Sequence, residues 1–432
     1  MNADLTKFDL ADEAGYGIIR TGIIGIGTSY STSNLLTCDS TQVAFIDQLV
    51  IQGWSADIAS NTTVVIEING VEMPFHIAGT VNARRFERLV WNTRGALVLH
   101  PGQTLRVKAP TYTAGNGSNT FERNIYVTGR YRIMPLLKAM QEGYFDGGTM
   151  PAVTTTLIDL DEDGSGTVAD TAEMIISPLA GHYVEVMGFA ITGHNYNTAL
   201  DSTLLTFWDG DGTIGSDGSK LFRAYHRGVG GVYQSKVLIG NTKGCIQGPS
   251  GDGLYVTQTS NVADATNPKV AVNVIYRYRK TTECAINTGA SLTSGSKKWW
   301  RYVESTTTGT TAFGSGLTPC GIRVRGQAIS MTGADNFTGN GKAQLLLGAS
   351  TGWGQVFEVQ GDGNGAAAGM SVGVDDEVLI CGSAQDPRFG IVNTASAITG
   401  LGHLVWGTMH ADIKNATSFA AGGTSIRDTW TA

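Results

Sequence analysis

Apolar residues alternate with small or polar residues along an early stretch of the chain, residues 43–52. One parity holds Val43, Phe45, Leu49 and Ile51, and the other holds Ala44, Gln48 and Gln52. A period of two predicts a β-strand with one buried face. The end of the stretch, residues 49–53, returns at 189–193 and 329–333, so that the closing glycines stand 140 residues apart. Such a repeat is longer than a solenoid unit of roughly 20–50 residues and predicts three copies of one domain.

A second predicted strand keeps the same period. It occupies residues 64–66, 204–206 and 345–347, and each copy ends on an aromatic-rich strand at 124–133, 270–279 or 403–409. Short strands with turn signals about every 8–12 residues, in units of roughly 120 residues, are typical of jelly-roll sandwiches. We therefore expect an all-β chain of three tandem antiparallel β-sandwich (jelly-roll-like) domains with N- and C-terminal arms. The pattern leaves the strand order open.

The alternation changes phase within the recurring strand. The change falls at Gly188 in the second copy, after Val184 and Val186, and at Gly326 in the third, after Ile322 and Val324. A β-bulge, or a strand that crosses between two sheets, would produce such a change.

The domain boundaries follow from the repeat and from changes in composition. They are an N-terminal arm 1–36, a first sandwich 37–134, a linker 135–156, a second sandwich 157–280, a Ser/Thr/Gly-rich connector 281–316, a third sandwich 317–414 and a C-terminal tail 415–432. Residues 136–142, after Pro135 and before Gly143, are the best helix candidate. The apolar, glycine-broken arm is expected to lie along a partner or a neighbouring domain, with a poorly ordered tail as the alternative.

Composition excludes several classes of function. The formal net charge is −7 and only 16% of residues are charged, which argues against broad nucleic-acid binding. The five cysteines are scattered without metal-ligand spacing and indicate reduced thiols, as expected of assembly in a reducing cytoplasm. No apolar run approaches the roughly 20 residues that span a bilayer, and the first residues lack a signal-peptide pattern. We expect a soluble, unexported protein without a membrane or nucleic-acid partner.

One acidic loop resembles a calcium-binding loop over its first eight positions. Its oxygen-bearing candidates are Asp161, Asp163, Ser165 and Thr167, with Gly166 at the turn position. Gly166 stands at position six, as in a calcium-binding loop. Position twelve, however, is Ala172, whereas a calcium-binding loop has a bidentate glutamate there. Two interpretations stay open: a bound calcium ion, or an acidic turn in which Gly and Asp supply the backbone conformation.

Two adjacent tryptophans, Trp299 and Trp300, stand between Lys298 and Arg301 in the second connector. Exposed tryptophans flanked by cations would mark an interface or a ligand site. The alternative is a strand that packs against the second or third copy.

No catalytic motif emerges from the sequence. It holds no nucleophile elbow, no zinc-protease helix motif and no phosphate loop. The seven histidines are spread over the copies without a shared position. We therefore predict that the protein is not an enzyme; a glycan hydrolase would need two carboxylates that converge in space, which no sequence pattern identifies.

Tandem sandwiches, flanking arms, few charges and abundant Thr/Gly/Asn turns resemble the structural proteins of tailed-phage virions. The resemblance is to a style of chain without a family signature. It implies a capsid decoration (cement) protein of a bacteriophage head that binds the major capsid protein or other virion subunits. Such a protein would be located in the virion, would be assembled in the host cytoplasm and could form a homo-oligomer. The alternatives are a tail, baseplate or fibre component, and a carbohydrate-binding adhesion protein that uses its exposed tryptophans.

Overall fold

The structure is a computed structural model of the 432-residue chain. It describes residues 16–20, 24–25, 31–55, 62–77, 85–109, 124–141, 149–159, 168–169, 173–194, 202–209, 219–229, 232–233, 237–240, 246–247, 253–260, 269–280, 299–305, 309–312, 321–331, 342–349, 352–360, 370–374, 379–381, 386–392 and 401–410. From residue 299 onward the description covers the backbone. Almost all of these residues lie in antiparallel strands, as the alternating pattern predicts.

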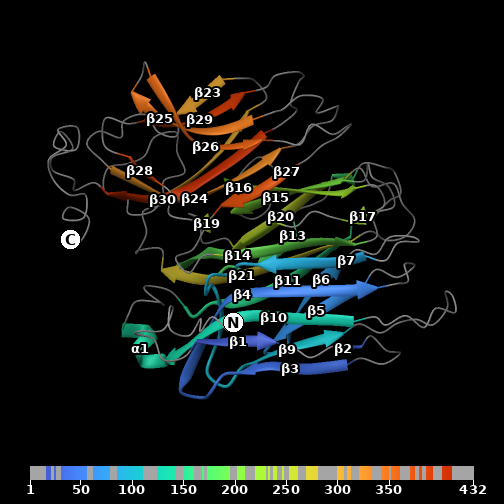
Figure 1. Ribbon diagram of the computed structural model, residues 1–432. Coiled ribbons are helices and arrows are strands. Elements are labelled where there is room, and N and C mark those ends of the chain that lie inside the picture. The colour runs from blue at the N-terminus through green and yellow to red at the C-terminus, as the bar shows by residue number, and fades with distance from the viewer. Residues whose placement is uncertain are drawn as a thin grey trace, which may run out of the picture.

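The first copy consists of two sheets that face each other across a core (Figure 1). Its first sheet has the order β1 (Tyr16–Arg20), β10 (Asn124–Pro135), β4 (Gln42–Ser55), β7 (Arg85–Trp91), with β2 (Ile24–Gly25) on β10 and β8 (Leu97–Leu99) on β4. Its second sheet has the order β3 (Ser31–Thr37), β9 (Thr104–Ala109), β5 (Thr62–Ile68), β6 (Val71–Ile77). Strands from distant parts of the copy alternate in each sheet, which is the jelly-roll arrangement.

The second and third copies repeat this strand order. In the second copy the first sheet has the order β11 (Ala152–Asp159), β21 (Lys269–Lys280), β14 (His182–His194), β18 (Val237–Gly240), with β19 (Ile246–Gln247) on β14. The second sheet has the order β12 (Val168–Ala169), β20 (Leu254–Ser260), β15 (Ser202–Asp209), β16 (Ser219–Val229), β17 (Val232–Tyr233), with β13 (Glu173–Ile176) on β20. In the third copy the first sheet has the order β22 (Trp299–Ser305), β30 (Leu401–His410), β24 (Gly321–Met331), β27 (Met370–Val374), with β28 (Leu379–Cys381) on β24. The second sheet has the order β23 (Gly309–Ala312), β29 (Asp386–Val392), β25 (Lys342–Ala349), β26 (Gly352–Gln360). The sequence repeat therefore corresponds to a repeat of topology.

Parts of the predicted arm and connector belong to the sheets. Strands β1, β2 and β3 lie within residues 1–36 or at their end, and they pair with β10 and β9. Strands β22 and β23 lie within residues 281–316 and pair with β30 and β29. The cause is long-range pairing, since Tyr16 pairs with Arg132 and Ser31 pairs with Ala109. Residues 1–15 and 411–432 lie outside the described residues.

The short helix predicted after Pro135 is confirmed as α1 (Leu136–Gln141). Its residue Ala139 is buried against Val43, Phe45, Val98 and Met134, on the side of the first sheet that faces away from the sandwich core. Helix α1 therefore covers one end of this outer sheet surface, while Leu137 and Met140 on its far side stay 73% and 58% exposed.

A β-bulge at Asp47 changes which face the β4 side chains reach. Strand β10 pairs Arg130 with Gln48 but Tyr131 with Ile46, so Asp47 has no opposite partner. As a consequence Ile46, Leu49 and Ile51 point into the sandwich core, whereas Phe45 contacts the helix side. The predicted single face for Val43, Phe45, Leu49 and Ile51 is thus wrong: all four are buried, but on opposite faces, because α1 covers the second one.

The predicted phase changes in the other copies are confirmed as bulges. The register between β14 and β21 shifts between Val186 and Gly188, and that between β24 and β30 shifts between Val324 and Gly326. In every copy the strand on the other side is interrupted at the same level, as β7 and β8, β18 and β19, or β27 and β28. The bulge is a recurring device that breaks one edge strand in two.

The core of the first copy continues into the second. Phe75 and Trp91 meet across the sandwich with ring centroids 5.8 Å apart. The same cluster of buried apolar residues also contains Met187, Ala190 and Ile275 of the second copy. Burial of each large apolar side chain contributes about 1.5–3 kcal/mol, so this continuity ties the two copies together strongly.

Consecutive copies contact each other in the same way. The first sheet of the second copy, through β11, β21 and β14, covers edge strand β6 of the first copy, and β18 contacts β7. The first sheet of the third copy, through β22, β30, β24 and β27, likewise covers β16, and β27 contacts β18. Figure 1 shows the copies stacked in chain order, from blue through green to orange. Each copy thus closes the edges of the copy before it.

Candidate functional site

The outer surface of the first sheet of copy one is the candidate site, and we call it the copy-one face. It is represented by Ile18, Asp47, Val50, Arg88 and Arg130. Backbone register places them together, because Ile18 lies opposite Arg130, Val50 lies between Thr128 and Val90, and Gln52 lies opposite Arg88. Their chain neighbours Ile19, Leu49 and Leu89 point the other way, into the core.

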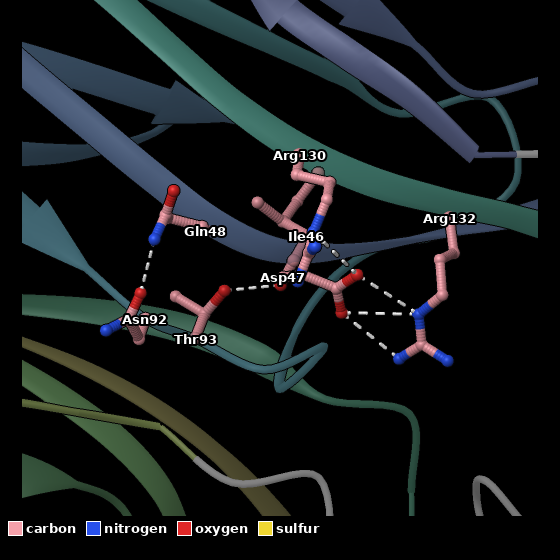
Figure 2. A network of polar contacts seen from close by, with 7 residues as sticks. All are labelled: Ile46, Asp47, Gln48, Asn92, Thr93, Arg130 and Arg132. Carbon is pink, nitrogen blue, oxygen red and sulfur yellow. Dashed lines mark hydrogen bonds and ion pairs between the residues drawn. The ribbon is translucent and has the colours of Figure 1, made fainter. Parts of the chain in front are cut away.

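The turn between β7 and β8 holds the bulge from one side. The amide of Arg94 donates to the carbonyl of Asp47 (2.8 Å), and the amide of Gly95 donates to the carbonyl of Ile46 (2.9 Å). The Thr93 hydroxyl also donates to the carbonyl of Ile46 (Figure 2). Arg94 and Gly95 reach these positions with φ of 50° and 78°, a region that favours glycine. The turn therefore satisfies the carbonyls that the bulge removes from the ladder.

The side chain of Asp47 accepts a two-pronged contact from Arg132. The Nε of Arg132 lies 3.2 Å from both carboxylate oxygens, and one terminal nitrogen lies 3.1 Å from Oδ1 (Figure 2). The two side chains are 10% and 16% exposed. The guanidinium also stands 5.7 Å from the centre of the Phe45 ring. This paired, partly stacked arginine fixes β10 to the bulge of β4.

A second cation reaches the same carboxylate from nearer the solvent. The Nε of Arg130 lies 4.0 Å from Oδ2 of Asp47, and its side chain is 59% exposed. Arg88 on β7 is also exposed, and Gln48 donates to Asn92 at 2.6 Å. Among the side chains described on the copy-one face, one carboxylate stands with three arginines, an excess of positive charge in a chain of net charge −7. Such a surface favours an acidic partner.

At the level of the bulge, the equivalent face of copy two is apolar and is covered by copy one. The bulge position there holds Met187, and the position opposite Gly188 holds Ile275; both belong to the core shared with copy one. Asp47 and Arg130 occupy the corresponding places in copy one. At the level of the bulge the two copies therefore present the same backbone surface with different chemistry, a buried apolar contact in copy two and charged side chains in copy one.

A buried ion pair also exists in copy two, at a shifted position. Arg277 corresponds to Arg132, and its Nε contacts the carboxylate of Glu185, with Arg279 3.5 Å from the same oxygen. Glu185 corresponds to Phe45 rather than to Asp47. These side chains are at most 5% exposed, and they hold β14 to β21. The arginine is shared by the two copies, whereas its acidic partner has moved along the strand.

Cysteine chemistry is restrained by burial. Cys38 is 1% exposed and its thiol donates to the carbonyl of Gln42 at 3.1 Å. Desolvation, aided by the charge of Asp39, raises the pKa of the Cys38 thiol to about 11. The thiolate, which is the nucleophile and metal ligand, is therefore scarce at neutral pH.

Of the sequence-predicted site residues, the structure describes Trp299 and Trp300, and neither belongs to the strands of the copy-one face. Asp161, Asp163, Ser165 and Thr167 lie outside the described residues, so the calcium interpretation stays a prediction. Trp299 and Trp300 begin β22, where their backbones pair with Gly407 and Trp406. The part of the chain that the structure describes contains no group of three His, Cys, Asp or Glu residues able to hold a metal, and no helix long and apolar enough to cross a membrane.

Sequence reasoning missed the copy-one face, although a signal for it exists. The comparison of equivalent strands shows a charge at position 47 where position 187 is methionine. The sequence does not show that Asp47 lies on the outer face until the bulge has been located. The bulge is hard to locate from the sequence because Phe45 and Leu49, on either side of it, are both apolar.

No protein-family model matches the sequence, and no curated protein matches it. Among solved structures, the chain is similar to one from the atomic structure of Sulfolobus turreted icosahedral virus (12% identity, 91% of this chain and 92% of that chain, TM-score 0.18). It is also similar to a chain from the triple jelly roll fold and turret assembly of an archaeal virus (11%, 93% and 91%, TM-score 0.19) and to PNGF-II (8%, 85% and 100%, TM-score 0.25).

Proposed function

We propose that the chain is a structural protein of a virion, and more specifically a capsid decoration (cement) protein that stabilises the head shell. The observation that carries the proposal is the serial docking of jelly-roll sheets, in which the core of copy one runs on into Met187, Ala190 and Ile275 of copy two. A chain built in this way holds a fixed shape over its first two copies. A structural component of a shell must keep such a fixed shape when the particle is under mechanical stress.

The chemistry of the candidate site also favours a structural role over a catalytic one. The carboxylate of Asp47 is held by Arg132, and the amides of Gln48 and Asn92 bond to each other. These contacts join β4 to β10 and to the β7–β8 turn. Polar groups arranged in this way position strands, whereas a catalytic carboxylate would have to face a substrate.

The stabilising mechanism would be mass action. A protein that binds the assembled shell but not its free subunits lowers the free energy of the shell, by about 2.7 kcal/mol at 100 times its dissociation constant. Because residues 16–37 are largely committed to the sheets of copy one, contacts to the shell would come mainly from outer surfaces. Exposed apolar side chains such as Leu137 and Met140 on α1 are suited to that contact.

The deciding experiment is mass spectrometry and electron microscopy of purified particles from the source of this sequence. We expect the chain in the particle, in a fixed ratio to the major capsid protein, with density on the head. Its presence only in the tail or baseplate would favour the first alternative. Its absence from every particle would contradict the proposal, and binding on a glycan array that is lost in Trp299→Ala and Trp300→Ala variants would instead support an adhesion protein.

A further inference from the structure

Within the described strands, the serial docking leaves two surfaces without a counterpart. Copies two and three each use their first sheet to cover the two edge strands of the copy before them. Among the described strands, the copy-one face covers no preceding copy, and the edges of copy three, β26 and β27, are covered by no following copy. The first surface has the geometry that covers an edge, and the second is an edge of the kind that is covered twice elsewhere in the chain.

We propose that these two surfaces bind each other between molecules, so that the copy-one face of one chain covers the β26–β27 edge of a second copy of this chain. The contact would continue the arrangement of β14 on β6 and of β24 on β16. It would also cover the nine-residue strand β26, whose outer side pairs with no described strand. Uncovered edges of this length are pairing hazards that folded proteins cover or block.

The chemistry of the copy-one face indicates a reversible contact. Met187 and Ile275 make the permanent junction between copies one and two, and Asp47 and Arg130 replace them at the free face. Arg130 is 59% exposed and would lose water on binding, so we expect a weaker contact here than the one made by buried methionine and isoleucine. The face nevertheless keeps an apolar anchor, because Ile18 lies opposite Arg130 and is 76% exposed. A surface of this composition fits a subunit contact that forms and breaks during assembly.

Charge complementarity selects the edge of copy three as the partner. The edge strands β26 and β27 together carry one acidic residue, Glu358, and no lysine or arginine. The copy-one face presents exposed Arg88 and Arg130. Opposite charges on the two surfaces would accelerate association and make it sensitive to salt.

The two surfaces differ, so the contact is heterologous. It produces a ring if the rotation between chains closes, and an open chain of molecules if it does not. This inference goes beyond the proposed function, because it concerns self-association of the purified protein and holds whether or not the partner particle is a virion.

The first test measures the mass of the full-length protein by sedimentation velocity at low and high salt. We expect oligomers at low salt that dissociate at about 1 M salt, where charges are screened within roughly 3 Å. Arg130→Glu should weaken association by about tenfold or more, whereas Lys280→Glu, an exposed charge at the end of β21, should leave it unchanged. A monomer at all concentrations and salts, or equal effects of the two variants, would overturn the proposal.

Mixing two variants tests the heterologous geometry. Glu358→Arg alters the edge, and Arg130→Glu alters the face, so each variant alone should stay monomeric. Their mixture should form complexes, because each variant still carries one intact surface. Hydrogen exchange should show new protection at residues 352–360 and at 124–135 in the associated state. Failure of the mixture to associate, or protection confined to one of these segments, would contradict the contact.

Discussion

The side-chain amide of Asn273, in the second copy, donates a hydrogen bond of 2.9 Å to the backbone carbonyl of Pro74 in the first, 199 residues away. The hydroxyl of Thr155 donates to the Oδ1 of Asn273 at 2.8 Å and thereby orients the amide. Because the N–H and C=O of a residue in a strand point to the same side, Pro74 lies where its missing N–H is turned away from β5. The second copy thus supplies a hydrogen-bond donor to a carbonyl of the edge strand β6.

Replacement of Asn273 by Asp should destabilise the junction by about 1–3 kcal/mol, because the carboxylate cannot donate to the Pro74 carbonyl. Urea unfolding followed by circular dichroism measures the loss, and hydrogen exchange should show faster exchange in β6. The control is Asn34→Asp on the exposed side of β3, which should change stability by less than about 0.5 kcal/mol. Equal effects of the two changes would contradict a role for the amide.

Replacement of Asp47 by Asn should lower the free energy of unfolding by about 1–3 kcal/mol. The pair with Arg132 is mostly buried, so its loss should exceed the roughly 0–1 kcal/mol of a surface pair. Thermal and urea unfolding measure the change.

The matched control for Asp47 is Glu72→Gln. Glu72 contacts Lys108 on the second sheet of copy one and is 55% exposed, so we expect a much smaller effect there. If Glu72→Gln costs as much as Asp47→Asn, the ordering of the two pairs by burial is wrong.

Replacement of Gly129 by Ala should cost about 1–3 kcal/mol or more, because a Cβ there would collide with the backbone carbonyl of Gln48 beside the bulge. Gly70, in the turn between β5 and β6, has φ of +84° and no atom near the added Cβ. Gly70→Ala should therefore cost only the backbone strain, about 1 kcal/mol. Differential scanning fluorimetry ranks the two variants, and a smaller loss for Gly129→Ala would show that β10 and β4 separate easily.

Cys38 should resist alkylation in the native protein at pH 8 and react readily in urea, as peptide mass spectrometry would show. Its pKa in the folded chain, about 11, exceeds the ordinary 9.0, so the folded state retains the proton longer than the unfolded state. The associated stability is complete below about pH 9 and falls as the pH rises from 9 towards 11. A Cys38→Ala variant should lose less stability over that interval; an identical pH profile would contradict the assignment.

Local patterns predicted what depends on local structure. The bulges near Gly188 and Gly326 follow from a phase change within a few residues, and α1 follows from the sequence after Pro135. The bulge at Asp47 escaped prediction because Phe45 and Leu49 are both apolar although they face opposite sides of the sheet. Helix α1 buries part of the outer face of this sheet, so both faces carry apolar residues there. The sequence pattern therefore cannot tell the outer face from the inner face.

Long-range pairing limited the prediction of boundaries and of the site. Nothing near Tyr16–Arg20 indicates its partner β10, which begins more than 100 residues later. The copy-one face likewise depends on a register match, since Arg130 and Ile275 correspond only when β10 and β21 are aligned through their pairing with β4 and β14. Its residues become a candidate site once the topology is known.

Pro74 also has a consequence for the order of synthesis. When copy one leaves the ribosome, strand β6 has no cover, since the residues that close it, up to Ile275, have yet to be translated. At roughly 5–20 residues per second, the wait lasts on the order of ten seconds or more. A proline in mid-strand denies a neighbouring nascent chain one of the backbone donors it would need to add a strand. Pro74, which accepts the hydrogen bond from Asn273 in the folded protein, would then also hinder strand addition to β6 by another chain during synthesis.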